Sequence, residues 1–182
     1  MPTYRILSSN AALLVVDIQE RLCAAMERES LERMLKRTGA AIEGAKALQL
    51  PILVTEQYSK GLGPTHHQLC ERLGGFKPVE KLAFSAATAE VLTRLEGRRQ
   101  ILLAGMETHV CVFQTVRDLV EKGFEAWILA DAILSRSAED RRVGLELCKE
   151  AGAHITTVES ALFDMLGRAG SPEFKLISSA VR

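Results

Sequence analysis

Short hydrophobic runs recur along the chain and are separated by longer stretches that mix apolar and charged residues. The runs lie at residues 11–16, 51–55, 101–105 and 127–130. A short continuous apolar run bounded by polar or turn-forming residues is typical of a strand buried on both faces. We therefore expect buried strands at these positions and a last strand at residues 154–158.

Helices are predicted between and after these strands. A long stretch rich in Leu, Ala, Arg and Glu follows the first run, and Thr88, the Ser137 capping box and the Ser171-Pro172 pair are typical helix starts. Three further helices are expected at residues 88–95, 109–122 and 137–150. A short helix before them should end at about residue 73, and a terminal helix should begin at residues 171–172. Residues 76–83 fit either a loop or a short edge strand.

Strands that alternate with helices at this spacing pair in parallel through right-handed crossovers. The pattern thus predicts an α/β protein, a three-layer α/β/α sandwich with a mostly parallel sheet. The chain has 182 residues and no linker, repeat or low-complexity segment, so we expect a single domain over residues 1–182.

Composition narrows the classes of function. Lys plus Arg and Asp plus Glu both number 23, so the formal net charge is zero, which argues against nucleic acid or an anionic membrane as a partner. The apolar run at 11–16 is far shorter than the ~20 residues of a membrane-spanning helix. The four cysteines are scattered without a CxxC pair, which favours reduced thiols in a cytoplasmic protein.

Polar residues follow the apolar runs, where open parallel sheets place their ligands. They are Asp17, Glu56 with Gln57, residues 107–111, and Asp131. No GxGxxG or GxxxxGK(S/T) motif follows any of the runs, which disfavours nucleotide binding. The function must therefore be argued from the site itself.

Cys111 lies in the first turn of a predicted helix, where unpaired N–H groups and the helix dipole favour a thiolate. It is either a nucleophile or a small buried side chain. The other three cysteines, Cys23, Cys70 and Cys148, lie within helical patterns, where an inert buried thiol is the ordinary case.

Other polar residues also have two interpretations. Asp17 is either a functional carboxylate or an N-cap, and Lys81 is either functional or a solvated loop lysine. Asp131 is expected to hold the turn that follows it. His66 and His67 are adjacent, so their side chains should diverge, and we expect them not to bind a metal ion.

Three segments together resemble the isochorismatase-like cysteine hydrolases. They are Val15-Val16-Asp17-Ile18-Gln19, Lys81-Leu-Ala-Phe-Ser85 and Gly105-Met-Glu-Thr-His-Val-Cys111-Val. Residues 55–63 and 130–136 further resemble the isochorismatase domain-containing branch, whose physiological substrates are mostly unassigned. The resemblance spans about residues 10–158 and implies the Rossmann-like, isochorismatase-type hydrolase fold.

The resemblance implies a catalytic triad of Asp17, Lys81 and Cys111 at the carboxyl edge of the sheet. Asp17 would accept the thiol proton, Lys81 would hold both anions, and the Cys111 thiolate would attack a carbonyl. The N–H groups of Glu107 and Cys111, beside a cis peptide between Met106 and Glu107, would form the oxyanion hole. The implied reaction is cleavage of a C–N amide bond of a small molecule through an acyl thioester.

Two departures from the family restrict the substrate. Nicotinamidases carry an Asp-x-His-x-x-His metal site after the second strand, where this chain has Glu56, Gln57 and Tyr58. We expect these three residues to line the substrate pocket, with no metal and no cofactor. True isochorismatases lack the catalytic cysteine, so Cys111 disfavours hydrolysis of isochorismate.

Two other functions stay open on the same fold. One is a catalytically quiet scaffold or interaction protein, and the other is a thiol redox sensor that uses Cys111, although no resolving cysteine is close in sequence. Relatives assemble and the chain is rich in apolar residues, so we expect a homo-oligomer, a dimer or a tetramer.

Overall fold

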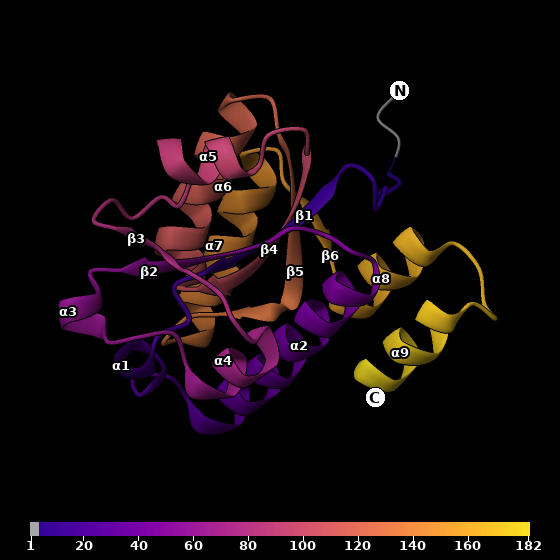
Figure 1. Ribbon diagram of the computed structural model, residues 1–182. Coiled ribbons are helices and arrows are strands. Elements are labelled where there is room, and N and C mark those ends of the chain that lie inside the picture. Colours follow the sequence, from indigo (N-terminus) through magenta and orange to yellow (C-terminus); the bar gives the residue numbers. More distant parts are fainter. Residues whose placement is uncertain (1–3) are drawn as a thin grey trace.

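The structure is a computed structural model and describes residues 4–182. Its strands and helices alternate along the chain, as the hydrophobic pattern predicts (Figure 1). The elements in chain order are β1 (Ala11–Val16), α1 (Glu20–Cys23), α2 (Arg28–Ala47), β2 (Ile52–Gln57), α3 (Ser59–Leu62), α4 (His67–Leu73), β3 (Val79–Lys81), α5 (Ala89–Arg94), β4 (Gln100–Met106), the π-helix η1 (Thr108–Val112), α6 (Phe113–Glu121), β5 (Glu125–Leu134), α7 (Ala138–Glu150), β6 (His154–Thr156), α8 (Val158–Leu166) and α9 (Pro172–Ala180).

The strands form one sheet in the order β3-β2-β1-β4-β5-β6, and every neighbouring pair is parallel. The chain builds outward from β1 on one side and from β4 on the other. The crevice of such a sheet lies where this order reverses, outside the carboxyl ends of the strands. β1 leads to Asp17 and β4 leads toward Cys111, so the topology brings these two residues to one place.

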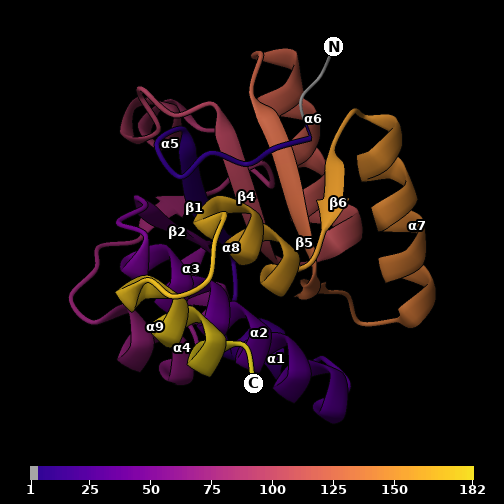
Figure 2. The ribbon, with the colours of Figure 1, turned by 90° about the vertical axis from the view of Figure 1, so that its right-hand side faces the viewer.

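Helices cover both faces of the sheet, which confirms the predicted three-layer α/β/α sandwich. Helices α2, α4, α8 and α9 cover one face, and α5, α6 and α7 cover the other (Figures 1 and 2). Leu13 and Val15 of β1 belong to the core on the first face, whereas Leu14 and Val16 belong to the core on the second. This alternation follows from the two-residue period of a strand. Within residues 4–182, no helix is long and apolar enough to cross a membrane.

Two strands are longer than their apolar runs. β2 continues through Glu56 and Gln57, and β5 spans ten residues, so Asp131 lies inside β5 and the prediction that it holds a following turn was wrong. Its carboxylate accepts a hydrogen bond from the Val158 N–H (2.9 Å) and lies 3.5 Å from the Arg37 guanidinium. These partners stabilise a charge within a strand, where the apolar pattern breaks.

Other boundaries also differ from the prediction. β3 is a short edge strand, which settles the open choice for residues 76–83, and the expected helix from residue 109 begins as η1 before it continues as α6. The last strand ends at Thr156, because the Thr157 side chain caps a helix, α8, that the prediction missed. The single turn α3 was also missed.

Two glycines allow close packing beside Cys111. Gly105 of β4 has φ 145°, and a Cβ atom there would lie 2.2 Å from the carbonyl oxygen of Val16. Gly144 of α7 packs against η1, and a Cβ atom there would lie 2.7 Å from the backbone nitrogen of His109. Neither contact leaves room for a side chain.

Candidate active site

Asp17 is held at the end of β1 by its neighbour in the sheet. Val16 pairs with Thr55 of β2, and the N–H of Asp17 donates to the Thr55 carbonyl oxygen (3.2 Å). The hydroxyl of Thr55 donates to Oδ1 of Asp17 at 2.7 Å. Asp17 is completely buried and has φ 52°, a left-handed conformation that non-glycine residues seldom adopt and that often marks functional sites.

Lys81 at the end of β3 presents its ammonium to Asp17. Nζ lies 2.6 Å from Oδ2 of Asp17 and also donates to Oε1 of Gln57 (2.8 Å). It donates further to the backbone carbonyl oxygens of Ala83 (3.1 Å) and Phe84 (2.9 Å). Lys81 is 4% exposed, so these acceptors replace the water that a buried ammonium has lost.

Cys111 is the fourth residue of η1 and completes the group. Its thiol lies close enough to the Asp17 carboxylate, the Lys81 ammonium and the backbone N–H of Glu107 for all three to act on its pKa. The Cys111 carbonyl oxygen accepts from the hydroxyl of Thr115 at 2.6 Å. The structure thus brings together Asp17, Lys81 and Cys111, which belong to three segments far apart in sequence.

Burial controls the protonation of this group. It raises the pKa of the Cys111 thiol to about 12, and the negative charge of Asp17 adds to this effect, while the Lys81 ammonium opposes it. The expectation that the helix start favours a thiolate was therefore wrong, because desolvation and a neighbouring carboxylate outweigh the helix dipole. Burial also raises the pKa of Asp17, which makes its carboxylate a stronger base.

The turn before Cys111 is tied to the segment after β5. The peptide bond between Met106 and Glu107 is cis, as the family resemblance implies. The Glu107 carboxylate accepts from the backbone N–H and the Nε–H of Arg136, both at 3.0 Å. The hydroxyl of Ser135 accepts from the N–H of Thr108 at 3.1 Å.

The three residues expected to line the pocket lie in different surroundings. Gln57 contacts Lys81, and its Nε2 donates to the Leu82 carbonyl oxygen (2.8 Å). Glu56 instead accepts from the N–H and the hydroxyl of Thr65, at 2.8 and 2.7 Å. Tyr58 is 52% exposed. The structure thus brings Gln57 to the triad, while it uses the Glu56 carboxylate to hold the loop after β2.

Sequence reasoning missed two residues that support the site. Thr55 holds the Asp17 carboxylate, and Gln19 holds the strand beside it: Oε1 of Gln19 accepts from the Gln57 N–H (2.7 Å), and Nε2 donates to the Gly63 carbonyl oxygen (2.6 Å). One signal was available for Thr55, which is the last residue of an apolar run and therefore lies at the same sheet edge as Asp17.

Exposed apolar side chains surround the Lys81 end of the site. Leu82 and Phe84, which follow Lys81 in sequence, are 76% and 54% exposed. Tyr58 joins them, because its backbone N–H donates to the Lys81 carbonyl oxygen at 2.9 Å. We call Tyr58, Leu82 and Phe84 the apolar rim.

Comparison with known proteins identifies the family. Residues 11–160 match the Isochorismatase domain. The chain is 36% identical over 185 residues to the secreted isochorismatase effector Isc1 of Phytophthora sojae, an alignment that covers 98% of this chain and 87% of the relative. It is 35% identical over 181 residues to isochorismatase domain-containing protein 2 of Bos taurus, covering 98% and 86% of the two chains.

A solved structure agrees with this result. The structure of the MAR1 ribonuclease from Caenorhabditis elegans superposes with a TM-score of 0.91 at 34% identity and covers 97% of this chain and 92% of that one. The matched domain includes Asp17, Lys81 and Cys111, and the relatives include the domain-containing branch that the sequence resembles. The chain belongs to the isochorismatase family.

Proposed function

We propose that this protein is a cysteine hydrolase that cleaves the C–N amide bond of a small molecule through an acyl-thioester intermediate. The observation that carries the proposal is the buried group of Asp17, Lys81 and Cys111: the cation lies 2.6 Å from the base, and both charges act on the pKa of the nucleophile. A family of this fold hosts several chemistries, so the proposal rests on the site rather than on the fold.

In the first step, the Asp17 carboxylate takes the thiol proton as the Cys111 sulfur bonds to the carbonyl carbon of the amide. The carbonyl electrons move to oxygen, and the resulting oxyanion is stabilised by the N–H groups of Glu107 and Cys111. The Lys81 ammonium keeps the Asp17 carboxylate in place. Proton removal is coupled to attack, because a free thiolate is disfavoured by a pKa of about 12.

In the second step, the oxyanion collapses and the C–N bond breaks, with Asp17 returning the proton to the leaving nitrogen. A water molecule, deprotonated by Asp17, then attacks the thioester carbonyl. The C–S bond breaks, the acid product leaves, and Cys111 regains its proton. These steps use no metal and no organic cofactor. In this proposal Gln57 and Tyr58 contact the substrate, and Glu56 supports the pocket indirectly by holding the loop after β2 through Thr65.

The direct test is turnover of a panel of small amides with ammonia release as the readout. Replacement of Cys111 by Ala should abolish turnover while the protein stays folded, because the nucleophile is lost but little volume is. Intact-mass measurement after a rapid quench should show an acyl adduct on the native protein and none on the variant. Retention of more than ~10% of the native kcat, a loss below ~1.4 kcal/mol, would contradict the proposal.

A second candidate is hydrolysis of RNA, since a solved relative is described as a ribonuclease. One observation favours it: a groove of about 870 Å³ contains five cationic side chains, Arg33, Lys36, Arg37, Arg136 and Arg141. Three of these cations, Arg33, Arg37 and Arg136, already face the carboxylates of Glu29, Asp131 and Glu107. Partial neutralisation weakens the field that a phosphate backbone needs, and we therefore prefer the amide.

Labelled single-stranded RNA separates the two candidates. Under the amide proposal, native protein and Cys111→Ala leave the RNA equally intact. Cleavage that falls in both Cys111→Ala and Arg33→Gln, but not in Arg28→Gln, would favour the ribonuclease. Arg28 is a matched control, because both arginines lie on α2 with an ion-paired glutamate four residues away, and only Arg33 lines the groove.

The raised pKa of Cys111 also bears on the redox-sensor alternative. Sensor thiols react through an exposed thiolate, whereas Cys111 is 7% exposed and its pKa is about 12. A scaffold would leave every amide intact in the turnover test.

For assembly, we propose a homo-oligomer that covers the apolar rim, and sedimentation equilibrium should show a dimer or larger at micromolar concentration. We place the protein in the cytoplasm, and fractionation of its native cells checks this.

A further inference from the structure

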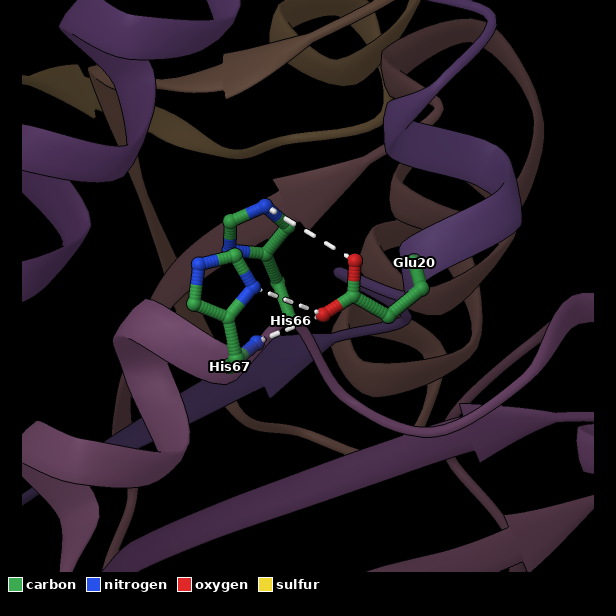
Figure 3. A group of neighbouring side chains, drawn as sticks. All are labelled: Glu20, His66 and His67. Atoms are coloured by element: carbon green, nitrogen blue, oxygen red, sulfur yellow. Dashed lines mark hydrogen bonds and ion pairs between the residues drawn. The ribbon is translucent and has the colours of Figure 1, made fainter.

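A second cluster of ionisable side chains lies between α1 and the start of α4. Glu20 opens α1, His66 precedes α4, and His67 is the first residue of α4. One potential ligand atom of each residue lies within 4.8 Å of the others. Figure 3 shows the two imidazole rings one over the other, with the Glu20 carboxylate facing both.

The expectation that adjacent histidines diverge was wrong for this pair. Their rings stack with centroids 4.4 Å apart and planes at 29°. The reason is local: the backbone is extended at His66 (φ −56°, ψ 131°) and enters a helix at His67, so the strict alternation of a strand does not apply. Both rings consequently turn toward α1.

The contacts within the cluster are incomplete. Oε1 of Glu20 accepts from the backbone N–H of His67 at 2.8 Å and lies 2.9 Å from its Nδ1. Oε2 lies 4.0 Å from Nε2 of His66, which is too long for a hydrogen bond. His66 is 7% exposed, and in the described part of the chain its Nδ1 has no hydrogen-bond partner. The nitrogen that faces Glu20 is Nε2 and not the unpartnered Nδ1, so the buried His66 ring makes no hydrogen bond to the Glu20 carboxylate through either nitrogen.

We propose that Glu20, His66 and His67 bind a divalent transition-metal ion, Zn²⁺ in the first place. Two imidazole nitrogens and a carboxylate oxygen are a ligand set that zinc prefers, with water in the fourth position. Bonds of about 2.1 Å would set the ligand atoms about 3.4 Å apart. His67 Nδ1 lies 2.9 Å from Oε1 and His66 Nε2 lies 4.0 Å from Oε2, so the two imidazoles face different oxygens of Glu20 and the side chains must rotate to converge on one ion.

The ion has a structural role in this arrangement. Glu20 follows Asp17 by three residues, and the N–H of His66 donates to the carbonyl oxygen of Ile18 at 2.8 Å. An ion on Glu20, His66 and His67 would therefore fasten α1 and the start of α4 to the segment that carries Asp17. If the ion binds the folded chain and not the unfolded chain, the free energy of unfolding rises with the logarithm of the free metal concentration.

Equilibrium dialysis of chelator-stripped full-length protein against zinc chloride tests the proposal. We expect one Zn²⁺ per chain with a dissociation constant in the micromolar range or tighter. His67→Gln and Glu20→Gln should each weaken binding by at least ~10-fold, and Zn²⁺ should no longer raise their Tm. Gln in place of Glu20 keeps an acceptor for the His67 N–H, so the fold is preserved. Gln68→Ala, exposed on the same helix, is the matched control and should behave as native.

Cobalt distinguishes this site from the thiols. Co²⁺ bound by nitrogen and oxygen should give visible d–d bands without a sulfur-to-metal charge-transfer band in the near ultraviolet. Three results would overturn the proposal. The first is that native protein binds no Zn²⁺ at a free concentration of about 100 μM, because the dissociation constant would then lie well above the expected micromolar range. The others are binding by His67→Gln and Glu20→Gln as tight as that of native protein, and a charge-transfer band, which would assign the metal to a cysteine.

Discussion

At the scale of single residues, the proton of Cys111 is governed by its surroundings. Asp17, Lys81 and Cys111 were all named from sequence motifs, and the structure places them in contact. The direction of the thiol pKa was not predictable, because it depends on how much water three distant segments exclude together. Thr55 was missed for a similar reason, since a threonine at a strand end is ordinary until its neighbour in the sheet is known.

Replacing Asp17 with Asn should separate thiol reactivity from turnover. The Asp17 charge raises the pKa of Cys111, whereas Lys81 lowers it, so the variant should have a lower thiol pKa and faster alkylation by iodoacetamide at neutral pH. Turnover should nevertheless fall by at least ~100-fold, because the general base is gone. Peptide mass mapping measures the alkylation of Cys111. If alkylation slows instead, the Asp17 charge does not act on the thiol.

Replacing Thr55 with Val should impair catalysis through Asp17. The change removes the hydroxyl that donates to Oδ1 and leaves a buried carboxylate oxygen short of a partner, at a cost of about 1–3 kcal/mol. We expect lower kcat with KM little changed, and a shift in the acidic limb of the pH–rate profile. Thr55→Ser keeps the hydroxyl and should restore both. A Ser variant as impaired as the Val variant would point to packing alone.

At the scale of elements, the pattern located β1, β4 and most helices, because each is a continuous apolar run or carries a clear cap. The pattern gave the wrong strand boundaries where pairing with other strands and helices outweighs the local sequence. β5 contains a charged residue that partners on α2 and α8 make acceptable, and β2 extends through polar residues that pair with β3. The π-helical start of the Cys111 helix has no local signal that separates it from an α-helix.

The contact between α7 and η1 leads to a prediction about a residue outside the triad. Gly144→Ala would place a Cβ atom 2.7 Å from the backbone nitrogen of His109, so α7 or η1 must move. We expect a Tm lower by several degrees, consistent with the ~1–3 kcal/mol cost of overpacking, and reduced kcat because η1 carries Cys111. Gly123→Ala is not a suitable control, because Gly123 has φ 78° and an alanine in this left-handed conformation would itself be strained. Ser160→Ala, exposed on α8, serves instead and should keep native kcat.

At the scale of the whole molecule, three buried thiols make the fold sensitive to alkali. Burial raises the pKa of Cys23, Cys111 and Cys148 to about 12 from an ordinary value of 9.0. Between these values the unfolded chain has released protons that the folded chain retains, so the free energy of unfolding must fall as pH rises. The slope is at most ~1.4 kcal/mol per pH unit for each thiol.

Urea unfolding at several pH values between about 8.5 and 10.5 measures this slope. Cys148→Val removes one thiol and nearly keeps its volume, so its slope should be shallower than the native slope. The comparison is needed because lysines and tyrosines titrate in the same range. A slope identical in the two proteins would show that the Cys148 thiol does not contribute.

The buried ammonium of Lys81 also restricts which molecules can react. Before attack, the net charge of the triad is zero, because the Lys81 ammonium balances the Asp17 carboxylate and the Cys111 thiol is neutral. When a neutral amide is attacked, the proton moves to Asp17 and the negative charge to the substrate oxygen, so the sum remains zero. A substrate with an ionised carboxylate beside its carbonyl would add an uncompensated charge among these buried groups. Under the proposed mechanism, we therefore expect the site to discriminate by charge at the reacting end and to favour amides that are neutral there.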